Sequence, residues 1–152
     1  MGWLSKLTGT IQSGVDSVKG EWDKFQRQDD VRAMLAAMAL VAGADNNIEK
    51  SEKEAGLTFL SKGNVFKGFD RKYLYDTMNE FYEKATNDFL REDLYAEIEG
   101  VADEPETRVA VIKTAISMAS ADGSIGDDEK VIIREICNRL GEDARKFPKI
   151  AA

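Results

Sequence analysis

Two stretches of this chain repeat one pattern, and that repeat decides the fold. Residues 40–53 read LVAGADNNIEKSEK, and residues 117–130 read SMASADGSIGDDEK. Across a constant interval of 77 residues the two stretches share Ala, Asp, Ile, Glu and Lys at matching positions. Each copy has an apolar run typical of the end of a helix, a short acidic turn, and a charged run typical of the start of the next helix. The repeat therefore predicts two helical hairpins.

Outside the repeat, the same helical periodicity continues along the chain. Apolar residues recur at intervals of three or four, and no segment alternates apolar and polar residues as a strand would. The predicted helices cover residues 3–25, 29–42, 49–61, 70–85, 87–101, 105–119 and 127–140. We therefore predict an all-α protein of about seven helices, with internally duplicated helical hairpins related by pseudo-two-fold symmetry.

The chain divides into an N-terminal amphipathic helix, residues 1–28, and a helical domain, residues 29–152. The half-repeats within that domain span about 29–63 and 104–141. The first helix carries large apolar side chains near its free end, which a membrane surface or a partner could contact. These are Trp3, Leu4, Leu7 and Ile11. The alternative is that this apolar stripe packs against its own domain, as such stripes more often do.

Composition and charge narrow the function classes. The 152 residues are 43% apolar and 32% charged with only two prolines, which indicates a folded helical protein rather than a disordered one. A net charge of -7 disfavours nonspecific nucleic-acid binding and favours cations or basic partners. The chain has one cysteine, no signal-peptide pattern and no run of eighteen apolar residues. We therefore expect a cytoplasmic protein that does not span a membrane.

Catalysis is not expected from these residues. Histidine is absent, which removes Ser/His and Cys/His nucleophile pairs and the usual zinc ligand sets. Cys137 lies on an apolar helical stripe with Ile133, Ile136 and Leu140, so we predict a buried structural thiol. The remaining carboxylates could serve a metal-assisted hydrolase, but paired carboxylates are a weak signal in an acidic protein.

Each acidic turn places an Asp seven residues before a Glu in the first turn of the following helix. Side chains at that interval can direct oxygen atoms at one point, and oxygen clusters suit hard cations. The loops lack the glycine and the glutamate that a twelve-residue EF-hand loop needs, so they are not EF-hands. One interpretation is therefore a site for a calcium-like divalent cation, built around Asp45 and Glu52 in one copy and Asp122 and Glu129 in the other.

Helix capping is the competing explanation for the same residues. Asp, Asn and Ser are favoured where helices start, and Glu in a first turn complements the helix dipole. Capping alone explains one copy well. It explains two copies with the same Asp-to-Glu interval less well, because capping tolerates many spacings. Both explanations stay open on the sequence.

These features together resemble the TerB tellurite-resistance family. The paired helix, the Ala-Asp-x-x-Ile turn and the Glu-bearing helix carry the resemblance, with the amphipathic start Met1-Gly2-Trp3-Leu4. The resemblance implies an all-helical fold with an internal duplication, and a role in the stress response encoded by a bacterial tellurite-resistance gene cluster. It also implies a membrane-embedded protein of the same cluster as partner, met at the inner face of the cytoplasmic membrane.

The resemblance further implies that the acidic turn residues bind a divalent metal. The metal ligands it implies are Asp45, Asn47 and Glu52 in the first copy, and Asp122, Ser124 and Glu129 in the second, with Asp127 and Asp128 as additional candidates. The first copy departs from the Asp-Gly pattern because Asn46 replaces the glycine. Asn tolerates left-handed backbone, so we expect the turn to persist. Lys50 and Ser51 replace Asp127 and Asp128, which predicts a weaker cation site.

The leading hypothesis is a non-enzymatic, cytoplasmic, divalent-metal-responsive interaction module of a tellurite-resistance system. In it, the cation joins turn and helix and stiffens an acidic docking surface. The alternative hypothesis is a peripheral membrane adaptor that is anchored by its first helix and whose acidic turns are only helix caps.

Overall fold

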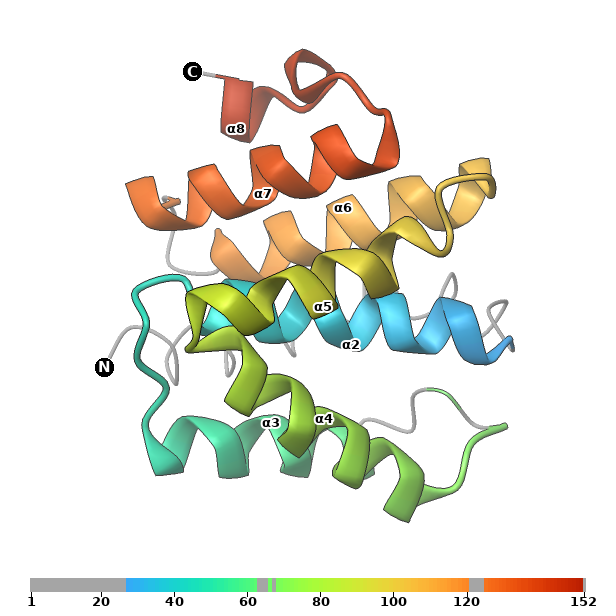
Figure 1. Cartoon of the computed structure of the whole chain (residues 1–152), viewed down its shortest axis with the longest axis vertical. Helices are drawn as coiled ribbons and strands as arrows, with labels where there is room; N and C mark the ends of the chain where they lie inside the picture. Colours follow the sequence, from blue (N-terminus) through green and yellow to red (C-terminus); the bar gives the residue numbers. More distant parts are fainter. Residues whose placement is uncertain (1–26, 63–65, 67, 121–124, 152) are drawn as a thin grey trace.

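The computed structural model describes residues 27–62, 66, 68–120 and 125–151, and all regular structure within them is helical (Figure 1). The helices are α2 (Gln28–Ala42), α3 (Lys50–Lys62), α4 (Arg71–Ala85), α5 (Asp88–Glu99), α6 (Pro105–Ala119), α7 (Asp127–Leu140), the 3-10 helix η1 (Ala144–Lys146) and α8 (Pro148–Ala151). The predicted all-α class is confirmed. The helix predicted within residues 1–28, with Trp3, Leu4, Leu7 and Ile11, lies outside the described residues.

Helix ends follow the local chemistry of their residues. The Asp70 carboxylate accepts the Lys72 N–H at 3.3 Å and caps α4, and the Asn87 side chain accepts the Phe89 N–H at 2.9 Å and caps α5. Pro105 is the first residue of α6, where its missing N–H costs nothing. Gly141 ends α7 in the left-handed region with a φ of 73°. Each of these boundaries was expected from the sequence.

Helix α2 forms the centre of the fold. Twelve of its fifteen residues are buried, so it is enclosed on all sides rather than on one face. It packs against α4, α5 and α6, and less closely against α7, while α3 is held mainly by α4 (Figure 1). The sequence predicted an apolar stripe on α2. The structure shows that the small alanines between the stripe residues are also buried, because neighbouring helices approach on every side.

Helices α2 and α6, the first helices of the two repeats, run parallel. Arg27 pairs with Glu104 at 3.3 Å, Thr107 donates to Asp30 at 3.4 Å, and Thr114 donates to the Met34 sulfur at 3.8 Å. The contacts ascend in the same order along both helices. The C-terminal ends of α2 and α6 therefore lie at the same end of the molecule, as do the starts of α3 and α7 (Figure 1).

The first two of these contacts join residues 77 positions apart, which is the interval of the sequence repeat. If a two-fold axis relates α2 to α6, residues at equivalent positions of the two helices contact each other across that axis. The pseudo-two-fold relation of the two halves itself stays a prediction.

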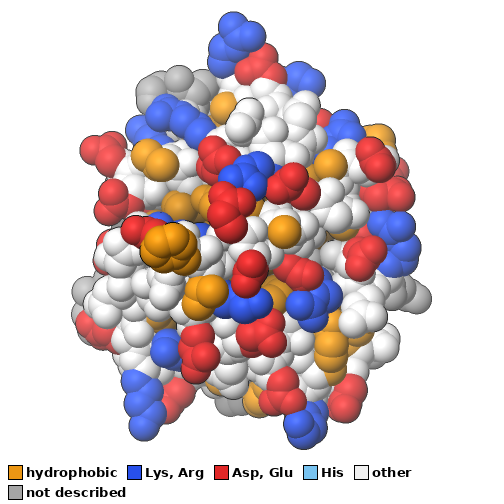
Figure 2. All heavy atoms as spheres, in the orientation of Figure 1, with side chains coloured by type: hydrophobic (Ala, Val, Ile, Leu, Met, Phe, Trp, Pro, Cys, Tyr) orange, Lys and Arg blue, Asp and Glu red, His pale blue; other side chains and the backbone are white. Residues whose placement is uncertain are grey.

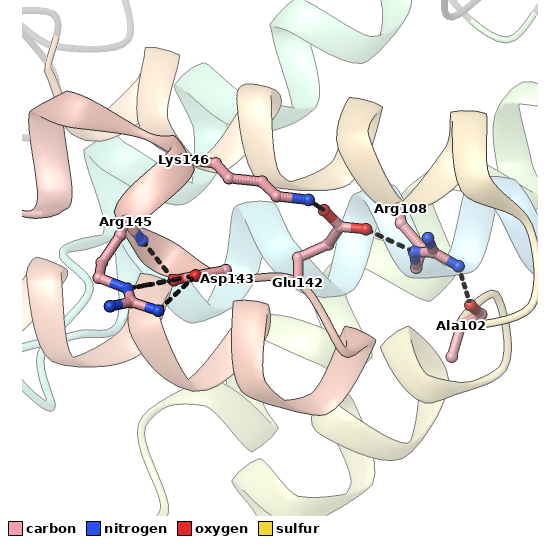
Figure 3. Close-up of polar contacts among 6 residues, drawn as sticks. All are labelled: Ala102, Arg108, Glu142, Asp143, Arg145 and Lys146. Carbon is pink, nitrogen blue, oxygen red and sulfur yellow. Dashed lines mark hydrogen bonds and ion pairs between the residues drawn. The ribbon is translucent and has the colours of Figure 1, made fainter.

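The C-terminal segment folds back onto α6 and α7 through arginine contacts. Arg108 of α6 donates to Glu142 at 2.9 Å and to the Ala102 carbonyl at 2.7 Å, and Lys146 pairs with the same glutamate at 3.8 Å (Figure 3). Arg134 of α7 donates to the Ile150 carbonyl at 2.8 Å, and the Ile150 side chain is fully buried. The segment after Gly141 therefore belongs to the packed domain.

Candidate functional site

The first acidic turn, residues 43–49, has a well-defined local structure. The Asp45 carboxylate accepts the Asn47 N–H at 3.1 Å, and the Asn46 N–H donates to the Gly43 carbonyl at 2.9 Å. Asn46 has a φ of 66°, so the expected left-handed residue is present at this position. Asp45 and Asn47 are exposed and Ile48 is buried. The turn therefore directs its polar side chains outward while its isoleucine anchors it to the core.

Arg91 of α5 fastens this turn to the body of the protein. Its guanidinium donates to the Gly43 carbonyl and, at 2.7 Å, to the Ala85 carbonyl at the end of α4. Both oxygens belong to helix C-termini, which lack partners within their own helices. Gly43 lies so close to α4 that an added Cβ would be 2.8 Å from the Ala85 oxygen. Sequence analysis missed Arg91, because no local pattern links it to Gly43, 48 residues away.

The second turn is described from Ile125 onward, while Asp122 and Ser124 lie outside the described residues. Glu129 turns back to its own helix start: its Oε1 accepts the Gly126 N–H at 2.9 Å, and the residue is only 7% exposed. This contact is a helix cap, as the capping interpretation predicts. Asp127 and Asp128 are exposed in the first turn of α7, where their charge complements the helix dipole.

The second turn also has a basic side chain beside it. Lys149 of α8 lies 3.4 Å from the hydroxyl of Ser120, which follows α6 directly. Ser120 occupies the position in the second repeat that Gly43 occupies in the first. In both repeats, a cationic side chain from outside the repeat contacts the residue two positions before the turn aspartate. Arg91 contacts Gly43, and Lys149 contacts Ser120. These positive charges offset part of the local negative charge.

No group of three or more His, Cys, Asp or Glu side chains that could hold a metal occurs within the described part of the chain. The predicted ligands Asp45, Asn47, Asp127, Asp128 and Glu129 are within that part. The side chain of Glu52 is outside it, together with Asp122 and Ser124. Neither predicted Asp–Glu pair is therefore described in full, and both ligand sets stay predictions.

The single thiol lies in the core, as predicted. Cys137 is buried between apolar neighbours of α7, and burial raises the pKa of its thiol to about 11. A thiol with that pKa is protonated at neutral pH, which suits a packing residue.

In the described ranges, no helix is both long enough and apolar enough to cross a bilayer.

Comparison with known proteins agrees with the repeat and the helical architecture. Comparison with curated proteins and with solved structures gives no match. A family model described as "Tellurite resistance protein TerB" matches residues 31–152, from the first turn of α2 to the end of the chain. Because that match includes both half-repeats and most of the chain, this all-helical protein is a member of the TerB family of tellurite-resistance proteins.

Proposed function

We propose that this TerB protein is a non-enzymatic, cytoplasmic stress-response protein that works as a divalent-metal-responsive interaction module. A calcium-like cation joins each acidic turn to the start of the following helix and stiffens the surface that carries them. The partner is a membrane-embedded protein of the same resistance system, met at the inner face of the cytoplasmic membrane. Family membership supports the link to tellurite resistance.

The observation that carries this proposal is the parallel packing of α2 and α6. It brings the ends of both first helices, and the starts of α3 and α7, to one end of the molecule (Figure 1). Two turns that serve only as helix caps have no need to lie at the same end of the molecule. Two turns that together form one acidic surface must lie at the same end. The exposed Asp45 and Asn47 leave oxygens free for a ligand at this end.

Amide chemical shifts recorded while calcium, magnesium or manganese is added test the metal response. We expect shifts concentrated at residues 45–47 and 127–129, with affinity on the order of micromolar to millimolar, because carboxylates with few neutral ligands bind weakly when solvated. Asp45→Asn should weaken the response of the first turn. The matched control is Asp103→Asn, which removes one exposed carboxylate at the other end of α6. Shifts spread evenly over the acidic surface would reject the site.

The peripheral membrane adaptor is the second candidate, and the Glu129 cap favours it. If the acidic turns serve only as caps, as the contact from Glu129 to the Gly126 N–H suggests, the apolar N-terminal residues carry the function instead. The triple variant Leu4→Ser, Leu7→Ser, Ile11→Ser should then abolish sedimentation of the full chain with anionic vesicles and leave its unfolding midpoint unchanged. A lowered midpoint would instead place the first helix in the core.

A further inference from the structure

Three large hydrophobic side chains are exposed among the described residues. Phe89 is 91% exposed, Val131 is 63% exposed and Leu90 is 39% exposed. Single exposed aliphatic residues are common on protein surfaces, but a phenylalanine that is almost fully solvated beside another apolar side chain is not. Phe89 and Leu90 belong to the first turn of α5, and Val131 belongs to the second turn of α7.

The two helices that carry these residues pack side by side in the same direction. Both begin at the end of the molecule where the acidic turns lie, and Arg139 of α7 reaches across to Glu92 and Glu99 of α5 (Figure 1). Figure 2 shows hydrophobic side chains near the start of α5 and over the first half of α7, with acidic side chains beside them. We name Phe89, Leu90 and Val131 the α5–α7 patch.

Phe89 is held in this exposed position by a rigid helix start. The Asn87 side chain accepts the Phe89 N–H at 2.9 Å and the Leu90 N–H at 3.4 Å, which fixes the backbone of the first turn. Arg91, two residues later, is anchored on the Gly43 and Ala85 carbonyls. The ring is therefore presented by an ordered element, and a partner would not have to order it on binding.

Acidic side chains surround the patch. Asp88 precedes Phe89, while Asp127 and Asp128 lie in the turn of α7 before Val131, and all three are exposed. Within the described residues, Asp127 and Asp128 carry no ion pair. Asp88 pairs with Arg91 at 3.4 Å. Arg139 shares its single charge among Glu92, Glu99 and Glu135, and Lys130 is half-buried. An apolar centre beside the carboxylates of Asp127 and Asp128 is complementary to a basic segment and repels an anionic membrane.

We propose that the α5–α7 patch is a docking surface for an amphipathic helical segment of a partner protein. That segment places large apolar side chains against Phe89 and lysine or arginine side chains against Asp127 and Asp128. Phe89 is the anchor, because an aromatic side chain buried at the centre of an interface carries much of the binding energy. The inference rests on the proposed role as an interaction module, and it does not depend on a bound cation.

The probe for this surface is a synthetic amphipathic helical peptide of about 18 leucine and lysine residues, long enough to stay partly helical. It is added to the full chain in EDTA while amide shifts are recorded. We expect shifts confined to residues 88–92 and 127–131, and weaker binding at higher salt. A peptide with glutamate in place of lysine should bind at least about tenfold more weakly, because its charge is repelled by the acidic neighbours.

Two pairs of variants identify the residues responsible. Phe89→Ser should weaken the leucine–lysine peptide at least about tenfold, whereas Phe89→Leu should retain most of the affinity. Neither should change the unfolding midpoint, because the ring is almost fully exposed. Asp127→Asn with Asp128→Asn should weaken binding. Asp103→Asn with Glu106→Gln, the same charge change at the start of α6, should leave it unchanged.

Three results would overturn this docking surface: shifts centred elsewhere, equal binding of the glutamate peptide, or full affinity in Phe89→Ser. Binding to vesicles of phosphatidylglycerol that requires Phe89 would assign the patch to a membrane and also overturn the proposal. Because every peptide arm is run in EDTA, peptide binding does not depend on a metal. If the separate metal titration gives no response at residues 45–47 while the peptide still binds, only the proposed metal role is rejected.

Discussion

The Thr107 hydroxyl donates a hydrogen bond to the buried carboxylate of Asp30, and the 77 residues between them equal the interval of the sequence repeat. Asp30 is 3% exposed and also accepts two hydrogen bonds from Arg27, at 2.8 and 3.1 Å. Arg27 in turn pairs with Glu104. One buried acid therefore joins the starts of the parallel helices α2 and α6, on which the placement of both acidic turns depends.

Removing this carboxylate should loosen the two helix starts. Asp30→Ala leaves the buried Thr107 hydroxyl without its acceptor and takes a favourable charge from the first turn of α2, so we expect a loss of about 1–3 kcal/mol in the free energy of unfolding. The control is Asp29→Ala, which removes an exposed acid from the same turn and should cost at most about 1 kcal/mol. Urea unfolding measures both, and equal losses would show that the contact with Thr107 is unimportant.

The close approach of the first turn to α4 predicts a strong effect at one glycine. In Gly43→Ala the new Cβ would lie 2.8 Å from the Ala85 oxygen and 2.9 Å from the Ala85 Cβ, so the turn or the end of α4 must move. We expect a loss of about 1–3 kcal/mol in unfolding free energy. Gly68→Ala is the matched control, because its Cβ would meet nothing within 4 Å. It should be neutral or slightly stabilising, and an equal loss at both sites would contradict the crowding argument.

The ion pairs that Arg139 forms with Glu92, Glu99 and Glu135 predict a defined pH dependence of stability. The hydrogen bond from Arg139 lowers the pKa of the Glu92 carboxyl below its ordinary value of 4.5. Because the folded pKa is the lower one, the stability from this pair is fully present above the ordinary pKa and is lost as the pH falls through the folded pKa. In Arg139→Gln the titration midpoint of Glu92 should move upward, as followed by carboxyl NMR.

The control for this shift is Asp143, whose pKa is lowered by hydrogen bonds from Arg145. It should titrate identically in the parent protein and in Arg139→Gln. An unchanged titration midpoint for Glu92 would mean that Arg139 does not form this hydrogen bond with Glu92 in solution.

The buried thiol should be unreactive in the folded protein. Burial raises the pKa of Cys137 to about 11, so the nucleophilic thiolate is scarce at neutral pH. Alkylation by iodoacetamide at pH 8 should therefore be slow and should accelerate when urea unfolds the chain. Rapid modification of the folded protein would contradict both the burial and the packing role.

Features set by a few neighbouring residues could be predicted from the sequence. The caps at Asp70 and Asn87, the proline that opens α6 and the left-handed Gly141 each depend on their own side chain or backbone. The left-handed Asn46 belongs to the same group. The all-α class followed from periodicity, because a spacing of three and four recurs along nearly the whole chain.

Features that depend on distant neighbours could not be predicted. The sequence predicts a helix over residues 29–42, but the burial of Asp30 depends on Thr107, which only the packing of α6 brings near. Arg91 reaches the first turn because the end of α4 lies beside it. The role of Glu129 as a cap was an open alternative, and its hydrogen bond to Gly126 became evident only in three dimensions.

The enclosure of α2 also limits how this duplicated protein can be divided. Its principal neighbours α4, α5 and α6 all lie outside the first half-repeat, and its own hairpin mate α3 is held mainly by α4. A fragment cut after residue 63 would expose α2, twelve of whose fifteen residues are buried in the whole chain, to water on nearly every side. The two copies of the repeat therefore share one core around α2, and we expect them to unfold together in a single cooperative transition.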